Sequence, residues 1–116
     1  MCRSLGELIT KGRFQKNFEL IHQMEASSGS IMDNIAEGFE RGTRAEFVQF
    51  LGYAKGSCGE LRSQLYRALD RGYISDAEFN ALKSSLIRIS SLIHNLISYL
   101  LKSKVGGVRN KVPTSA

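Results

Sequence analysis

The feature that most constrains the fold is a pair of long apolar stripes, one over residues 47–68 and one over residues 82–100. Within each stripe apolar residues recur at alternating intervals of four and three positions, the period of one helix face. Such seven-residue repeats favour nearly parallel helices that pack along their whole length. They therefore predict an all-α bundle with cores formed by Phe47, Leu51, Ala54, Cys58, Leu61, Leu65 and Ala68, and by Leu82, Leu86, Ile89, Ile93, Leu96 and Leu100.

Turn and capping signals give the boundaries of these helices. Gly42 precedes the sequence Thr-Arg-Ala-Glu at residues 43–46, and Gly72 precedes Ser-Asp-Ala-Glu at residues 75–78. A glycine that ends one helix, followed by a capping box that begins the next, is a specific boundary signal. A further helix is expected over residues 18–39, with small residues at 26–30 that allow a neighbour to pack closely. A short first helix is expected at about residues 5–12, and no strand pattern is present.

Length and composition indicate one domain. The chain has 116 residues and a net charge of +5, so we expect a single helical domain over residues 1–103 and a flexible basic tail over residues 104–116. No segment has the pattern of a signal peptide or a membrane span, which predicts a cytoplasmic protein without membrane contact. Cys2 and Cys58 lack metal-ligand spacing, and His22 and His94 stand alone. The sequence thus predicts no catalytic residues, metal site, cofactor or small-molecule substrate.

Several polar residues interrupt the apolar stripes. A carboxylate beside a bundle core must be paired or protonated, because an unpaired buried charge is costly. We interpret this set as a structural network that fixes the register of the helices. An acid/base pair is the catalytic alternative, but no nucleophile or metal ligand accompanies it. The network comprises Asn34, Glu37, Arg41, Glu60 and Gln64.

Positive charge is unevenly distributed. Residues 19–40 contain five acids and no Lys or Arg, whereas the segments on either side are basic. Such asymmetry is typical of proteins that bind a polyanion, most often nucleic acid, although a solvated basic surface gives the same pattern. Arg44, Lys55 and Arg62 share one sector of their helix, and Arg67 and Arg71 point elsewhere as a second patch. These five residues are the candidate nucleic-acid contacts.

Two helices carry more apolar residues than the core of one bundle needs. A helix that is apolar on more than one side has to be buried on more than one side, and self-association is the simplest way to achieve this. The sequence therefore predicts a homo-oligomer. The additional apolar residues are Ile87, Leu92, Ile97, Tyr99 and Leu101 in one helix, and Phe50 and Tyr53 in the other.

Two motifs resemble a known family. Asn-Ile-Ala-Glu-Gly at residues 34–38 and Gly-Ser-x-x-Glu at residues 56–60, together with Gly-Tyr-Ile at residues 72–74, are similar to bacterial four-helix-bundle proteins encoded in intervening sequences of 23S rRNA genes. The resemblance covers about residues 14–100. It implies an antiparallel, up-and-down four-helix bundle that assembles into a ring- or barrel-like homopentamer. It also implies kinship with the accessory variability proteins of diversity-generating retroelements, which bind RNA and a reverse transcriptase.

The chain departs from this family at two places. Its first helix is shortened, and residues 25–26 are Glu-Ala where many members have paired arginines. The second difference disfavours nucleic-acid contacts by that helix.

Two functions remain open at this point. The first is a non-enzymatic oligomer that binds RNA or another nucleic acid through basic surfaces of the assembled ring. The alternative is an interaction scaffold or accessory subunit for a partner such as a reverse transcriptase or a ribosome-associated factor. The salt dependence of binding distinguishes these two functions, because the affinity of contacts to phosphates falls steeply as the salt concentration rises.

Overall fold

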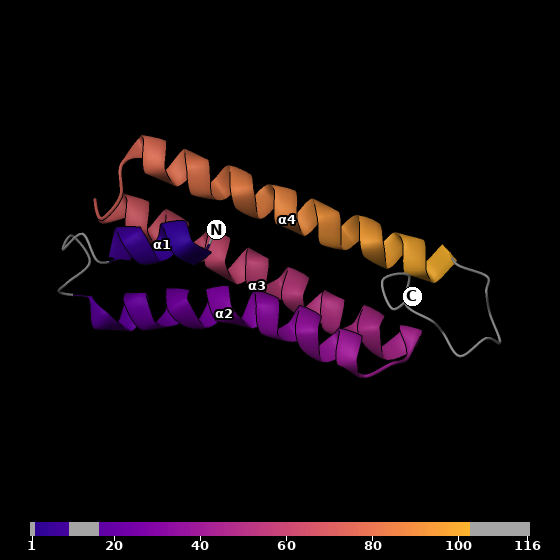
Figure 1. The fold of residues 1–116 in the computed structure, drawn as a ribbon. Coiled ribbons are helices and arrows are strands. Elements are labelled where there is room, and N and C mark those ends of the chain that lie inside the picture. Colours follow the sequence, from indigo (N-terminus) through magenta and orange to yellow (C-terminus); the bar gives the residue numbers. More distant parts are fainter. Residues whose placement is uncertain (1, 10–16, 103–116) are drawn as a thin grey trace.

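Four helices form an elongated antiparallel bundle. The computed structural model describes residues 2–9 and 17–102, which contain α1 (Cys2–Ile9), α2 (Phe18–Glu40), α3 (Arg44–Asp70) and α4 (Asp76–Lys102) and no strand (Figure 1). The all-α prediction is confirmed. The predicted tail, residues 104–116, lies outside the described residues. None of the helices described here combines the length and the apolar character needed to cross a membrane.

The helix boundaries follow the predicted capping signals. At the start of α3, the side chain of Thr43 accepts a hydrogen bond from the backbone N–H of Glu46 at 3.2 Å. At the start of α4, Ser75 and Glu78 form a reciprocal box, with distances of 3.1 and 2.8 Å. Gly42 and Gly72 have φ angles of +80° and +75°, the left-handed conformation that ends a helix and that glycine adopts without strain. Both predicted boundaries are therefore confirmed.

The core follows the predicted stripes. All seven stripe residues of α3 are buried, and Ala54, Leu61 and Ala68 have no exposed surface. In α4 the residues Leu82, Leu86, Ile93 and Leu100 are buried, and Ile89 and Leu96 pack partly buried against them. Further side chains complete the core. They are Leu5 from α1, Leu20, Met24 and Ile31 from α2, Ile74 from the turn between α3 and α4, and Phe79 from the first turn of α4.

Small residues bring α2 and α3 close together. Ser27 and Ser28 in the middle of α2 are 7% and 4% exposed, as the run of small residues predicts. Near the end of the same helix, a Cβ atom at Gly38 would lie only 2.6 Å from the Cβ of Phe50. A side chain at Gly38 would therefore separate the two helices.

The first helix is much shorter than the other three. It has eight residues and packs against α2 (Figure 1). The molecule extends over 53 × 21 × 20 Å, so an eight-residue helix, about 12 Å long, covers only part of its length. Several large apolar side chains of the other helices are exposed to solvent, among them Met32, Tyr53, Leu92, Tyr99 and Leu101. Of the predicted surplus, Phe50 and Ile97 are instead half-buried.

Candidate nucleic-acid interface

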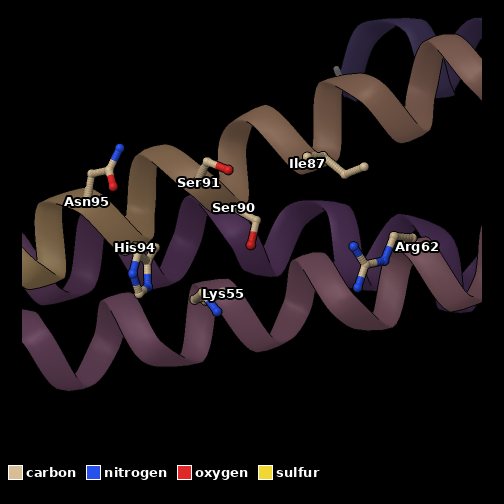
Figure 2. Close-up of a pocket in the computed structure, with 7 residues that line it drawn as sticks. All are labelled: Lys55, Arg62, Ile87, Ser90, Ser91, His94 and Asn95. Atoms are coloured by element: carbon tan, nitrogen blue, oxygen red, sulfur yellow. The ribbon is translucent and has the colours of Figure 1, made fainter.

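Two of the predicted cationic residues lie in one pocket between α3 and α4. Lys55 and Arg62 are seven residues apart, so they lie on the same side of α3, separated by about 10.5 Å along the helix axis. They line a pocket of about 290 Å³. In Figure 2, Ser90 and His94 point from α4 toward α3, with Lys55 beneath them. The residues that line the pocket are Lys55, Arg62, Ile87, Ser90, Ser91, His94 and Asn95.

The chemistry of this pocket suits an anion. The ammonium of Lys55 and the guanidinium of Arg62 donate hydrogen bonds and accept none, and the hydroxyl and amide groups of Ser90, Ser91 and Asn95 can also donate. None of the described residues that line the pocket is a carboxylate. A phosphate group placed here would therefore find donors and positive charge without a competing negative group.

The pocket contains serine and histidine but lacks the arrangement of a hydrolase. Ser90 and Ser91 precede His94 by four and three residues on α4. A catalytic imidazole needs a third group that fixes its tautomer and orientation, usually a carboxylate. Because no lining residue supplies one, the pocket does not point to an enzyme. Among the residues that the structure describes, no cluster of His, Cys, Asp or Glu can hold a metal ion.

The predicted second patch is a separate and less positive site. Arg67 and Arg71 line a smaller pocket of about 90 Å³ with Asn17, Leu20 and Asp70. The carboxylate of Asp70 offsets part of their charge, and Nη1 of Arg67 already donates to Oε1 of Gln23 at 2.9 Å. Arg44 is a half-buried residue at the first turn of α3 and does not line either pocket. The structure thus divides the five candidate nucleic-acid contacts among three places.

The predicted polar network divides in a similar way. Asn34 donates from Nδ2 to the carbonyl oxygen and the hydroxyl of Ser30, at 2.8 and 2.9 Å. The Ser30 hydroxyl is 2.9 Å from that of Ser57 on α3, and Ser57 in turn donates to the carbonyl of Tyr53. This chain of hydrogen bonds crosses between α2 and α3 without a charged group. Of the predicted network, only Asn34 belongs to it.

Glu37 and Arg41 belong to an exposed cluster at the α2–α3 turn. Nε of Arg41 lies 2.8 Å from Glu37, and Nη1 lies 3.2 Å from Glu46. The hydrogen bond with Glu37, more than any other contact, raises the pKa of the Arg41 guanidinium above its ordinary value. About half of each side chain of the Glu37–Arg41 pair is exposed. Ion pairs between exposed side chains contribute little to stability, so this cluster orders a surface turn and does not compensate a buried charge.

The positions of Glu60 and Gln64 show that the predicted carboxylate beside the core is not there. Glu60 is exposed on α3, so its charge stays in water and needs no buried partner. Gln64 is half-buried, and its Oε1 atom finds no hydrogen-bond partner among the described residues. The five predicted residues therefore do not form one network in the single chain.

The buried cysteine of α3 is part of the core. Cys58 is 3% exposed and lies among the other stripe residues. Burial raises the pKa of its thiol, while the positive charges of Lys55 and Arg62 act in the opposite direction. A thiol with a raised pKa is a poor nucleophile at neutral pH, which agrees with a structural role.

Sequence reasoning missed the contribution of α4 to the pocket. Four polar residues of α4 were not candidates, although their spacing of one, four and five positions places them along one side of the helix. They are Ser90, Ser91, His94 and Asn95. That pattern is a usable signal. The spacing identifies a polar side of α4, but it does not tell which neighbouring helix this side faces.

The fold and this pocket define a small all-α bundle with a pocket of cationic and polar residues between its last two helices. Residues 2–95 match the family described as 23S rRNA-intervening sequence protein, and the chain belongs to that family. The match confirms the resemblance found in the sequence motifs.

A solved structure has the same fold. It is the crystal structure of a protein of unknown function from the S23 ribosomal protein family of Bacteroides thetaiotaomicron. The two are 24% identical and superpose with a TM-score of 0.74 over 83% of this chain and 87% of the other. At that identity the likeness establishes the fold alone. No curated protein matches the chain.

Proposed function

We propose that this chain is a non-enzymatic RNA-binding protein whose α3–α4 pocket holds phosphates of the RNA backbone. The observation that carries the proposal is the pairing of Lys55 with Arg62 in a pocket whose described lining includes polar donors and no carboxylate. The family description refers to intervening sequences of 23S rRNA, which makes RNA the first polyanion to test.

The dependence of binding on salt tests this proposal. Each phosphate contact to a single strand contributes about 0.7 to the slope of log K against log salt concentration. We expect binding of an RNA oligonucleotide to weaken steeply as salt rises. In a Lys55→Gln/Arg62→Gln variant the slope should be smaller by about 1.4, because two contacts are lost. Fluorescence anisotropy over a range of salt concentrations measures both values.

The control is an Arg3→Gln/Arg71→Gln variant, which loses the same charge outside the pocket and should keep nearly the full slope. An unchanged slope after substitution of Lys55 and Arg62 would contradict the proposed phosphate contacts. Binding of a protein partner that resists high salt, without retention of RNA, would favour the interaction scaffold instead.

We further propose that copies of the chain associate through the exposed apolar side of α4. Leu92 and Tyr99 are 61% and 56% exposed and lie two helical turns apart on one side of the helix. Ser90 and His94 are each two positions from Leu92, which places them about 200° away around the helix axis. Association through Leu92 and Tyr99 would therefore leave the pocket accessible. The family resemblance suggests five copies.

Charged substitutions on this side should dissociate the assembly. We expect the particles of a Leu92→Lys/Tyr99→Lys variant to have a lower mass in solution than those of the unmodified protein. Association through this side would bury two unpaired ammonium groups in each copy, which is costly. An Ile87→Lys/Leu101→Lys variant adds the same charge on another side of α4 and should keep the mass of the assembly. Light scattering coupled to size-exclusion chromatography measures the masses. Equal masses for all three proteins would refute this interface, and so would an unmodified protein that is monomeric at high concentration.

A further inference from the structure

We propose that the RNA bound by this chain is single-stranded and that Tyr66 stacks on one of its unpaired bases, beside the Lys55–Arg62 pocket. The inference depends on the proposed function, because it specifies which form of RNA the same surface accepts. It adds a base platform formed by Tyr66, Phe79 and Lys83 at the end of the seam between α3 and α4.

The position of Tyr66 continues the row of cations on α3. It follows Arg62 by four residues, so the two side chains are neighbours on one side of the helix, about 6 Å apart along the axis. Lys55, Arg62 and Tyr66 thus succeed one another along the same seam. A nucleotide whose phosphate lies at Arg62 has its base within reach of the Tyr66 ring.

The Tyr66 ring is both accessible and fixed in position. It is 43% exposed, whereas its neighbour Phe79 is only 5% exposed. The two ring centroids are 4.7 Å apart, and the rings meet edge to face at 63°. This buried neighbour supports Tyr66 from below, so little conformational freedom is lost when a base stacks on the ring.

Lys83 adds a positive charge to the platform. Its Nζ atom lies 5.3 Å from the centroid of Tyr66 and 5.7 Å from that of Phe79. Lys83 is half-buried, and stacking of a base on an aromatic ring contributes at least as much as a cation–π contact of this kind. The flexible side chain of Lys83 can turn away from the ring and contact the phosphate of the stacked nucleotide. The platform then binds the base and the backbone together.

A single strand suits this arrangement better than a duplex. In a duplex the faces of the bases are covered by their neighbours in the stack, whereas an unpaired base offers a free face. The seam also resembles surfaces that bind single strands without sequence preference, which combine cations along the backbone with aromatic platforms. Tyr53, the other exposed tyrosine of α3, lacks this context. It is two positions from Lys55 and therefore lies on the opposite side of the helix.

A tryptophan reporter tests the inference directly, because the chain contains no tryptophan. We expect the emission of a Tyr66→Trp variant to be quenched when a short single-stranded oligoadenylate RNA is added at low salt. A duplex RNA of the same length should quench it much less. A Tyr53→Trp variant, which carries the reporter on the opposite side of α3, should show little change with either RNA.

Affinity supplies the second measurement. We expect Tyr66→Ala to weaken binding of the single strand by about 5- to 150-fold, the range expected for loss of one stacked base. Tyr66→Phe keeps the ring and should bind nearly as well as the unmodified protein. Binding of the duplex should be the same for all three proteins. Single-stranded DNA of the same sequence shows whether the ribose contributes.

The outcomes separate this inference from the proposed function. If the unmodified protein binds RNA and loses it on substitution of Lys55 and Arg62, but Tyr66→Ala binds normally and Tyr66→Trp is not quenched, the stacking inference is wrong and the proposed function stands. If the unmodified protein binds no RNA even at low salt, both are wrong. Should Tyr66→Ala not fold, the quenching of the folded Tyr66→Trp and Tyr53→Trp variants decides.

Discussion

Replacement of both Lys55 and Arg62 by glutamate is expected to abolish retention of RNA while the helical fold persists. Both side chains are exposed, so neither supports the core. A hydrogen bond to a charged group contributes about 1.5–3 kcal/mol, and each 1.4 kcal/mol is a factor of ten in affinity. Loss of two such contacts therefore weakens binding about 100-fold or more, and the two new carboxylates repel phosphate in addition. A gel shift at low salt measures retention, and circular dichroism verifies the fold.

The matched control reverses two arginines outside the pocket, in an Arg3→Glu/Arg71→Glu variant. It changes the net charge by the same amount, so a general effect of charge would weaken binding equally in both proteins. We expect a much smaller loss here, because Arg71 lies beside Asp70 in the separate pocket. Equal losses would show that RNA responds to the overall charge of the molecule and not to the α3–α4 pocket.

The fold was largely predictable because its determinants are local in sequence. Thr43 and Ser75 cap helices within three residues of their own positions, and Gly42 and Gly72 end the preceding helices through their own backbone conformation. The stripes of α3 and α4 are equally local, since a repeat of seven residues defines one side of a helix without reference to its neighbours. All of these features could be read without knowledge of the tertiary arrangement.

The candidate site was predictable only in part because it depends on how the helices face one another. The seven-residue spacing of Lys55 and Arg62 placed both on one side of α3, as predicted. Which residues of α4 lie opposite them depends on the rotation of α4 about its own axis, and the sequence of α3 carries no information on that angle. Ser90 and His94 were missed for this reason.

The misplaced carboxylate has a different cause, which lies within α3 itself. Glu60 follows the core residue Cys58 by two positions, which directs it away from the stripe by about 200°. The sequence interpretation nevertheless placed it beside the bundle core. In the described bundle α3 packs against α2 and α4, and Glu60 remains in solvent.

The close approach of α2 and α3 leads to a prediction of opposite effects at two glycines. A Gly38→Ala substitution would place a Cβ atom 2.6 Å from the Cβ of Phe50 and 3.1 Å from Cδ1 of Phe47. The Cβ of Phe50 is fixed to the backbone of α3, so the clash can be relieved only if the helices move apart. Overpacking costs about 1–3 kcal/mol, and a contact of 2.6 Å with an atom that cannot rotate away belongs to the upper part of this range, above the gain of about 1 kcal/mol in helix propensity from alanine. We therefore expect a lower free energy of unfolding.

Gly29→Ala provides the internal standard, because it makes the same chemical change in the same helix with no atom within 4 Å of the added methyl group. Here only the gain in helix propensity remains, and the free energy of unfolding should rise by as much as about 1 kcal/mol. Urea denaturation followed by circular dichroism measures both differences. Stabilisation by both substitutions would mean that α2 and α3 are farther apart at Gly38 than described. Destabilisation by both would mean that Gly29 is covered, for example by another copy of the chain, and the mass of the Gly29→Ala variant would then show whether that contact had been lost.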